Sequence, residues 1–366
     1  MINKKGSVLL FTLLILSLLT ILTQQLVRNV LIGSNFTNRI VAMEKAQMLA
    51  LGGVNLAISQ LTKRVLTEKE ERRLNEKDTP EKAFQRFLLK VLPNLNRWQT
   101  FDLEEKFDGM RGQVKICITC ENGKININEA FDFQKNEFKE KYKLLLQNLF
   151  IKGKLAEGEI LKVLTEFFKT RKKKLDDVTE LLEVPGLENV TDLFYKPPKM
   201  PESKKNAEPN SDICLQDLFT TWSADDKIEL LFFSDSMDAV IGLRRPLAND
   251  AQKLKEKFKT LIEAFKKDWG ADWEKNWTNL QPIYGPISPH VKSYKDILSK
   301  EFGPGVYSVL SCGTAEGVEQ KLLAVIKEVE KDDKEQQKNK TPEQNKKEQE
   351  GKSSKKYFKI LRLYWL

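Results

Sequence analysis

The amino-acid sequence predicts an α+β fold. An uncharged apolar run follows the N terminus and leads into an amphipathic helical pattern. Alternating apolar residues, which indicate strands, occur near residues 114–127 and again after residue 305. Between these two places, from residue 129 to about residue 300, apolar residues recur mostly at helical spacing. We therefore expect one long helix, a few strands and a large helical region.

The length and charge of the chain set broad limits. Its 366 residues are enough for two or three domains. It carries 61 Lys and Arg against 52 Asp and Glu, a formal net charge of +9. This balance suits nucleic acid or an anionic membrane surface, but lysine is spread through the whole chain, as on an ordinary solvated surface. We therefore expect no nucleic acid among the partners.

The residues that commonly carry enzyme chemistry are scarce. His290 is the single histidine, so a hydrolase with a histidine base or a zinc site built on several histidines has little to draw on. No GxSxG, HExxH, Walker A or Rossmann glycine pattern occurs. The sequence therefore predicts a protein that is not an enzyme.

Two of the four cysteines, Cys117 and Cys120, have CxxC spacing. The alternation of Val114–Ile118 places them on a strand, where three steps separate the Cα atoms by roughly 10 Å. A disulfide needs less than about 7 Å, and no second CxxC completes a zinc site. We expect this pair to be structural, while the state of the four cysteines stays open.

The N terminus has the composition of a membrane segment. A short basic leader, Met1–Gly6, precedes an uncharged run from Ser7 to Thr23. Extended through Val27, the run has roughly 20 residues, the length that spans a bilayer. A cleaved secretory signal needs small residues at a cut site, and none is well placed between Thr23 and Gly33. A lipoprotein signal needs a cysteine there, which is absent. A plain signal anchor remains open.

A helical pattern continues beyond the apolar run. Apolar residues recur at threes and fours and define one face, which Gln47 interrupts. That face comprises Ile40, Met43, Ala50, Val54, Ala57 and Leu61. We expect a transmembrane and stalk helix over residues 7–66.

The motif Lys4-Lys5-Gly6 directly before the apolar run resembles the class III leader of type IV pilins and type II secretion pseudopilins. The resemblance implies that a prepilin peptidase cuts between Gly6 and Ser7 on the cytoplasmic face and that the new N terminus is methylated. A glycine leaves room for an extended backbone in a protease cleft. The resemblance also implies a single-pass inner-membrane protein whose body lies in the periplasm.

Phe11 is the fifth residue after the predicted cut, where major pilins carry glutamate. In that family the glutamate pairs with the terminal ammonium of the adjacent, earlier-assembled subunit, because a buried glutamate without a partner is costly. A subunit that assembles first has no such neighbour. The K-type minor pseudopilin (general secretion pathway protein K) lacks this glutamate, so the chain resembles that family. Phe11 is then expected to act in assembly.

A hairpin is expected next, with strands at Val114–Ile118 and Ile125–Ile127 and a tight turn at Asn122-Gly123. The segment Glu121–Asn128 contains a Gly-Lys-hydrophobic-Asn-hydrophobic-Asn run. It resembles the corresponding segment of K-type pseudopilins.

Within the helical region, residues 175–187 resemble half of a helix-hairpin-helix or SAM-like unit, behind the basic run Arg171–Lys174. In DNA-binding hairpins several glycines let backbone N–H groups meet phosphate. Here only Gly186 is present, and Glu188 stands where a second glycine would help. We favour structural packing and keep a membrane-tethered DNA-binding or DNA-uptake protein as the alternative function.

Two further patterns lie in the helical region. Trp269, Trp273 and Trp277 recur every four residues, which favours a buried seam over a ligand platform. Several aspartates could in part supply oxygen ligands to calcium, which the K-type resemblance also implies for this kind of domain. They are Asp225, Asp226, Asp235, Asp238 and Asp250. Their spacing matches no EF-hand loop, so we assign no cofactor and no ligands, with calcium left open.

The C terminus returns to strand patterns at Val306–Cys312, Gln320–Ile326 and Tyr357–Trp365. This order resembles the closing sheet of K-type pseudopilins. Residues 331–356 are nearly all polar or charged and cannot bury enough apolar surface to order themselves. We expect a disordered insertion there.

The resemblance gives the fold class its full form: a pilin-like N-terminal helix on a small antiparallel sheet, with a large inserted α-helical domain. The expected boundaries are leader 1–6, helix 7–66, first part of the α/β head 67–128, inserted SAM-like domain 129–304 and closing strands 305–366. The resemblance implies a minor pseudopilin at the tip of the type II secretion pseudopilus, which helps to nucleate the filament and promotes protein export. The implied partners are other minor pseudopilins, the major pseudopilin, prepilin peptidase and inner-membrane lipid.

Overall fold

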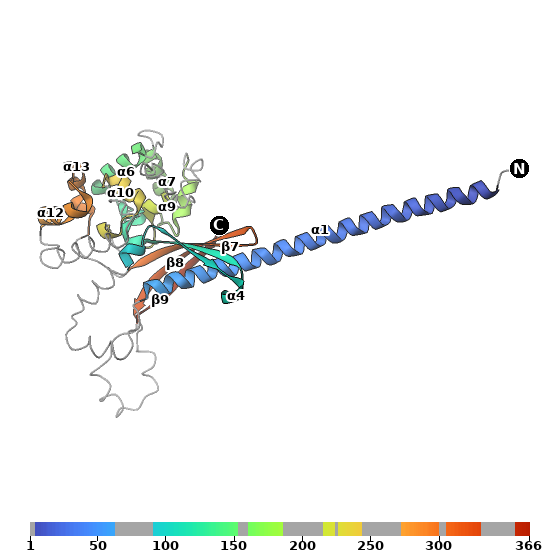
Figure 1. The fold of residues 1–366 in the computed structure, drawn as a ribbon. Helices are drawn as coiled ribbons and strands as arrows, with labels where there is room; N and C mark the ends of the chain where they lie inside the picture. The colour runs from blue at the N-terminus through green and yellow to red at the C-terminus, as the bar shows by residue number, and fades with distance from the viewer. Residues whose placement is uncertain are drawn as a thin grey trace, which may run out of the picture.

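The structure is a computed structural model, and it describes residues 4–62, 91–152, 160–185, 215–223, 226–243, 272–299, 305–330 and 356–366. A long helix, a five-stranded sheet and a group of short helices make up these residues (Figure 1). The α+β fold class predicted from the sequence is confirmed.

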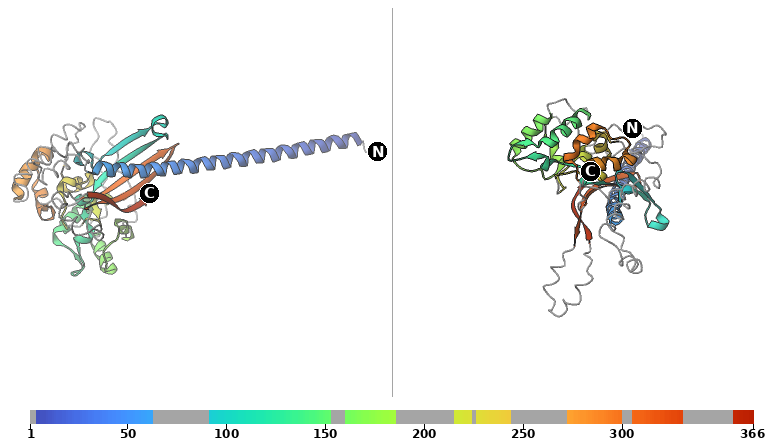
Figure 2. Two further views of the ribbon diagram at one scale, coloured as in Figure 1. Left: turned by 90° about the horizontal axis from the view of Figure 1, so that it is seen from below. Right: turned by 90° about the vertical axis from the view of Figure 1, so that its left-hand side faces the viewer.

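Helix α1 runs without a break from Lys4 to Leu61, which is 58 residues. At 1.5 Å per residue it is about 90 Å long. Its N-terminal part stands clear of every other described element, while its C-terminal part lies along the sheet (Figures 1 and 2). The helix begins within the predicted leader and ends before the predicted bound at residue 66, which lies outside the described residues.

The sheet has the order β1-β2-β7-β8-β9, and every neighbouring pair is antiparallel. The strands are β1 (Trp98–Leu103), β2 (Gly112–Cys120), β7 (Val306–Ala315), β8 (Val318–Glu330) and β9 (Lys356–Trp365). Helix α1 packs on one face, mainly over β7, β8 and β2. The three closing strands are therefore confirmed, whereas β1 had no clear signal in the sequence. Lys356 belongs to β9, and the rest of the predicted insertion lies outside the described residues.

The helical region is inserted between β2 and β7, as predicted. The chain leaves the sheet after β2, forms a series of short helices, and returns at β7 (Figure 1). The helices are η2 (Glu121–Gly123), α5 (Ile127–Ala130), α6 (Glu140–Lys152), α7 (Ile160–Arg171), η3 (Val178–Glu183), α9 (Leu215–Leu218), η5 (Leu230–Phe232), α10 (Asp235–Ile241), α12 (Trp273–Tyr284), α13 (Pro289–Lys292) and η6 (Ser293–Ile297). Two short helices precede them, η1 (Leu92–Asn94) and α4 (Glu105–Asp108).

The predicted hairpin at Asn122-Gly123 is wrong. Both edges of β2 are occupied, one by β1 and the other by β7, so no edge remains for a returning strand. The strand after the turn, β3 (Ile125–Asn126), pairs in parallel with β6 (Phe219–Thr220) instead. A second small pair, β4 (Phe131–Asp132) with β5 (Glu137–Phe138), also lies in the helical region.

The predicted buried face of α1 is correct from Ala50 to Leu61, but Ile40 is 40% exposed. The helix meets the sheet only from Ala42 onward, which is 3% exposed. Residues before this point have no sheet to pack against, so helical periodicity alone does not bury them.

The inserted region has an aromatic core. The centroid of the Phe131 ring lies 5.0 Å from that of Phe133, 5.1 Å from that of Phe138 and 4.9 Å from that of Phe168. Trp273 and Trp277 stack at 4.9 Å, and Trp277 is 1% exposed. The buried tryptophan seam is thus confirmed for these two residues, while Trp269 lies outside the described residues.

Candidate functional site

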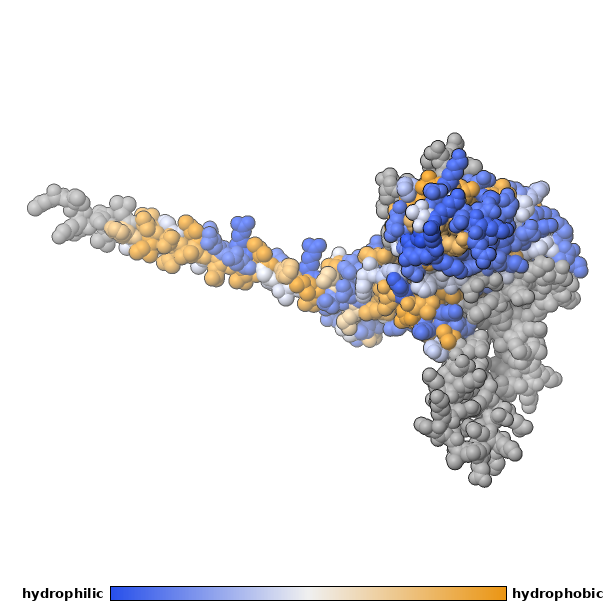
Figure 3. Space-filling model, turned by 180° about the vertical axis from the view of Figure 1, so that it is seen from behind, coloured by the Kyte–Doolittle hydropathy of each residue, from blue (hydrophilic) through white to orange (hydrophobic). Residues whose placement is uncertain are grey.

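The N-terminal half of α1 presents large apolar side chains to its surroundings (Figure 3). From Phe11 to Phe36 these side chains are each 53–67% exposed. Among the described helices, α1 is long and apolar enough to cross a membrane. Such a surface is stable only in lipid or against other apolar helices.

Hydroxyl side chains in this half of α1 form hydrogen bonds within the helix itself. The hydroxyl groups of Ser17, Thr20 and Thr23 donate to the carbonyl oxygens four residues earlier, at 2.8, 2.8 and 2.5 Å. Thr37 does the same at 2.9 Å. Because these donors are satisfied within the helix, they need no water. The hydroxyl groups therefore do not oppose insertion.

Charges are absent from the predicted span. Between Lys5 and Arg28 the sequence has no charged residue, and the first acidic residue of the chain is Glu44. Phe11 lies in this uncharged stretch and is 65% exposed. The predicted cut site, Gly6 and Ser7, lies in the first turns of α1. A glycine there weakens the helix locally, which eases local unwinding.

Small residues let the other half of α1 approach the sheet closely. A Cβ atom on Gly53 would lie 2.8 Å from Val114 Cγ1 and 3.0 Å from Ile116 Cγ2, and would overlap the hydroxyl of Ser311. On the sheet side, a Cβ atom on Gly313 would lie 2.6 Å from the backbone nitrogen of Ala50. Neither glycine was predicted from the sequence, although two adjacent glycines within a helix are a usable signal of close packing.

The segment Glu121–Asn128, which carried the resemblance, forms the junction between the sheet and the inserted region. Asn122 donates to Glu229 Oε1 at 2.8 Å, and the backbone N–H of Glu229 donates to the Asn122 carbonyl at 2.8 Å. A Cβ atom on Gly123 would lie 2.9 Å from the backbone nitrogen of Phe233, so only glycine fits there. The Gly-Lys-Asn run therefore holds the two parts of the head together.

Two asparagines complete the junction. Asn126 caps α5 by accepting from the N–H groups of Asn128 and Glu129 at 3.1 and 3.3 Å, and it donates to the Ser223 carbonyl at 2.5 Å. Asn128 donates to the Leu175 carbonyl at 2.8 Å and accepts from the Leu175 N–H at 2.7 Å. These amides satisfy backbone groups that no strand or helix partner reaches.

A buried ion pair lies beside the junction. Lys124 pairs with Glu121, which also accepts from the Ser308 hydroxyl of β7, and both charged side chains are at most 3% exposed. They line a cavity of about 190 Å³ between the sheet and η3. Across it the Tyr364 hydroxyl donates to Asp177. Burial, and then this bond, raise the pKa of Tyr364 well above its usual value.

The helix-hairpin-helix-like segment is packed in the head. Asp177 and Glu180 form a capping box at the start of η3. Arg171 pairs with Glu180, and more weakly with Glu183 at 3.5 Å. Lys174 pairs with Glu129 at 2.6 Å. Two of the four basic residues of the run are thus neutralised within the protein, while Gly186 and Glu188 lie outside the described residues.

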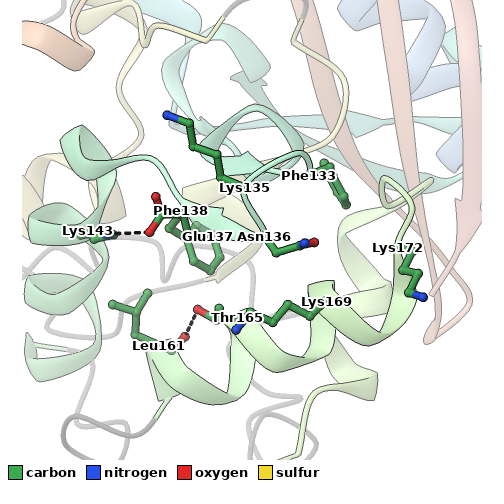
Figure 4. A pocket seen from close by; sticks show the side chains of 10 residues that line it. All are labelled: Phe133, Lys135, Asn136, Glu137, Phe138, Lys143, Leu161, Thr165, Lys169 and Lys172. Atoms are coloured by element: carbon green, nitrogen blue, oxygen red, sulfur yellow. Dashed lines mark hydrogen bonds and ion pairs between the residues drawn. The ribbon is translucent and has the colours of Figure 1, made fainter.

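An open groove of about 880 Å³ lies between the β4–β5 pair and α7 (Figure 4). Phe133 and Leu161 line it together with four lysines. Lys143 is held by Glu137 at 3.5 Å and by Glu140 at 2.7 Å. The groove is mainly lysine-rimmed surface and brings no catalytic set together among the described residues.

No group of three His, Cys, Asp or Glu side chains in the described residues is placed to hold a metal ion. Asp226 binds Lys141 at 2.6 Å, and this bond lowers the pKa of Asp226. Cys117, Cys120 and Cys312 are buried thiols. Cys117 and Cys120 both lie on strand β2, as the alternation predicts, while Asp225, Asp250 and Cys214 lie outside the described residues.

No protein-family model matches the chain, and no curated protein matches it. The chain is similar to a chain of the crystal structure of the GspK-GspI-GspJ complex from the enterotoxigenic Escherichia coli type 2 secretion system. The identity is 14% and the TM-score 0.35, over 83% of this chain and 99% of that chain.

Proposed function

We propose that the chain is a minor pseudopilin of a type II secretion system, anchored in the inner membrane with its body in the periplasm. The observation that carries the proposal is the division of α1. One continuous helix has an N-terminal half that is bare and apolar and a C-terminal half that is packed on a sheet. A subunit that is stored in a membrane and then added to a filament needs this division, because its bare half must pack first in lipid and later among other stalks.

Processing is the first step of this proposal. Prepilin peptidase cuts between Gly6 and Ser7, and the new terminus is methylated. The variant Gly6→Arg is expected to accumulate in the membrane at full length, whereas the matched variant Lys5→Arg keeps the charge and is cut. Mass determination of the N terminus from the membrane fraction reads out both variants. Uncut protein in unmodified cells would contradict the pseudopilin proposal.

Phe11 supports a place at the tip of the filament. An apolar residue cannot neutralise the terminal ammonium of an earlier subunit, so the chain is poorly suited to join below one. The inserted region between β2 and β7 also adds bulk to the head (Figure 1). Repeated along a thin filament, such heads would collide, whereas a single terminal head has free space. The chain would then nucleate the filament together with other minor pseudopilins.

The tip position is tested by Phe11→Glu, with Phe11→Leu as the matched control. A carboxylate without a partner in an apolar setting costs several kcal/mol unless it becomes protonated. We expect Phe11→Glu to lower the number of filaments without unfolding the head, and Phe11→Leu to behave as the parent chain. Quantitative labelling of isolated filaments gives the copy number. Many copies along the shaft would contradict the tip position.

The alternative, a membrane-tethered DNA-binding protein, has less support from the contacts. Arg171 and Lys174 are paired with acidic side chains of the head, so phosphate would have to displace these carboxylates. A salt-dependent mobility shift of duplex DNA by the full chain in detergent would restore this alternative.

Calcium is proposed as an optional ligand of the inserted domain on the strength of the family resemblance. We assign no ligands to it. Thermal unfolding of the full chain in calcium and in a chelator tests the idea, because a ligand of the folded state raises Tm. Identical Tm values in the two buffers would remove calcium from the proposal.

A further inference from the structure

Strand β9 has an outer edge that no described strand covers. It closes one end of the five-stranded sheet and runs for 10 residues, from Lys356 to Trp365. No described strand pairs with its outer side. Every second backbone N–H and C=O group along such an edge faces outward and can template another strand. Long edges of this kind are usually covered or interrupted. The pairing of β9 with β8 skips Leu361, but the strand otherwise runs on from Lys356 to Trp365.

The same strand carries an exposed apolar stripe. Ile360, Leu363 and Trp365 are 41%, 45% and 47% exposed. Their partners across the ladder in β8 are Ile326, Ala324 and Leu322, which are all fully buried. Directly paired residues share a face of the sheet.

That face is the one on which α1 packs. Gly313 of β7, which lies against the backbone of α1, pairs with Gln320 of β8. Gln320 precedes Leu322 by two residues, so both point to the same side. Helix α1 packs mainly over β7, β8 and β2. The apolar stripe of β9 continues the core beyond the cover that α1 provides.

The charge of the strand selects the kind of partner. Residues 356–366 include Lys356, Lys359 and Arg362 and no acidic residue. Lys359 and Arg362 are exposed. Each lies beside a residue of the apolar stripe but on the opposite face, as the pairing with β8 shows. Two copies of β9 side by side would bring like charges together, which is unfavourable. An acidic strand would pair favourably.

We propose that the outer edge of β9 binds an extended segment of another protein as a sixth strand. The segment alternates apolar residues, which cover Ile360, Leu363 and Trp365, with acidic residues, which meet Lys359 and Arg362. Backbone hydrogen bonds to the edge supply affinity, and the alternation supplies selectivity. This surface is separate from the bare half of α1, so the inference does not depend on the proposed function.

The test uses the full chain in detergent and an octapeptide that alternates valine and glutamate. Two control peptides separate pairing from simple charge attraction: one alternates valine and lysine, and one holds the valines and glutamates in separate blocks. We expect the alternating acidic peptide to bind at least about tenfold more tightly than either control, a difference of about 1.4 kcal/mol. Hydrogen exchange should slow at the amides of β9. Equal affinities, or slower exchange only elsewhere, would overturn the proposal.

A charge-reversed variant tests the selectivity. Lys359→Glu with Arg362→Glu should reverse the preference, so that the lysine peptide binds more tightly than the glutamate peptide. The matched control is Lys106→Glu with Arg111→Glu, which changes two exposed charges beside the far edge of the sheet. It should keep the preference of the parent chain. An unchanged preference in the β9 variant, or an equal reversal in the control, would also overturn the proposal.

Discussion

Two adjacent glycines in α1 offer a direct measurement of how closely the stalk packs on the sheet. A Cβ atom on Gly52 would face open space, with no atom within 4 Å, whereas one on Gly53 would face the sheet. Gly52→Ala and Gly53→Ala make the same chemical change in the same helix, one residue apart. Their difference therefore isolates the contact with the sheet.

The expected magnitudes follow from the contacts. Either substitution favours the helix by about 0.5–1 kcal/mol, because alanine loses less backbone entropy than glycine. The new methyl at Gly53 also meets Val114 and Ile116 at 2.8 and 3.0 Å. Both side chains are β-branched and stiff, so they cannot move aside freely. Overpacking of this kind costs about 1–3 kcal/mol. Gly52→Ala should stabilise the protein, and Gly53→Ala should be about 1–3 kcal/mol less stable than Gly52→Ala.

Urea unfolding of the full chain in a non-ionic detergent, followed by tryptophan fluorescence, measures this difference. Tryptophans of the head, such as Trp98 and Trp277, report its unfolding rather than that of the membrane half of α1. In a thermal scan the expected difference is about 2–4 °C per kcal/mol for a domain of this size class. Equal stability of the two variants would show that α1 does not approach the sheet as closely as the structure has it.

Two further predictions concern buried polar groups. Lys124→Met removes one half of the buried pair with Glu121 and should lower the free energy of unfolding in urea by about 3–5 kcal/mol. As a control, Lys321→Met breaks a pair with Glu319 whose side chains are 39% and 46% exposed. This variant should change the free energy of unfolding by less than about 1 kcal/mol. Similar losses in the two variants would refute the burial of the pair between Lys124 and Glu121. Burial raises the pKa of Cys312 to about 11, so iodoacetamide at mildly alkaline pH should label this thiol only after unfolding, as peptide mass analysis would show. Rapid labelling of the folded chain would contradict this prediction.

The long-range order of the fold was predictable because its signals are strong. The apolar run of α1 and the alternation of the closing strands each depend on composition over many residues. The stalk face was predicted correctly where α1 has a sheet to cover. At Ile40 the periodicity continues but the sheet does not, and periodicity alone cannot distinguish the two situations.

The hairpin failed for a related reason. An Asn-Gly pair between alternating residues is a strong local hairpin signal. The pairing of β2 with β7 brings together residues separated by the entire inserted region, and it leaves no free edge for a local return. Strand β1, which is short and whose side chains are half-exposed, pairs with the other edge of β2. No local pattern contains this information, since it depends on contacts between distant segments.

The same topology explains why the Glu121–Asn128 segment is rich in polar residues. Between the end of a buried strand and the start of the next helix, the backbone N–H and C=O groups have no partner in either element. Beyond β2, Asn126 accepts from the N–H groups at the start of α5, and Asn128 bonds to the backbone of Leu175. Asn122 bonds to Glu229, which lies just before η5. Gly123 permits the approach of that segment, since any side chain there would meet the backbone of Phe232. The motif therefore meets a structural requirement for inserting a large domain between two neighbouring strands. Asparagine-to-alanine changes in the motif should loosen the inserted domain before they affect the packing of α1 on the sheet.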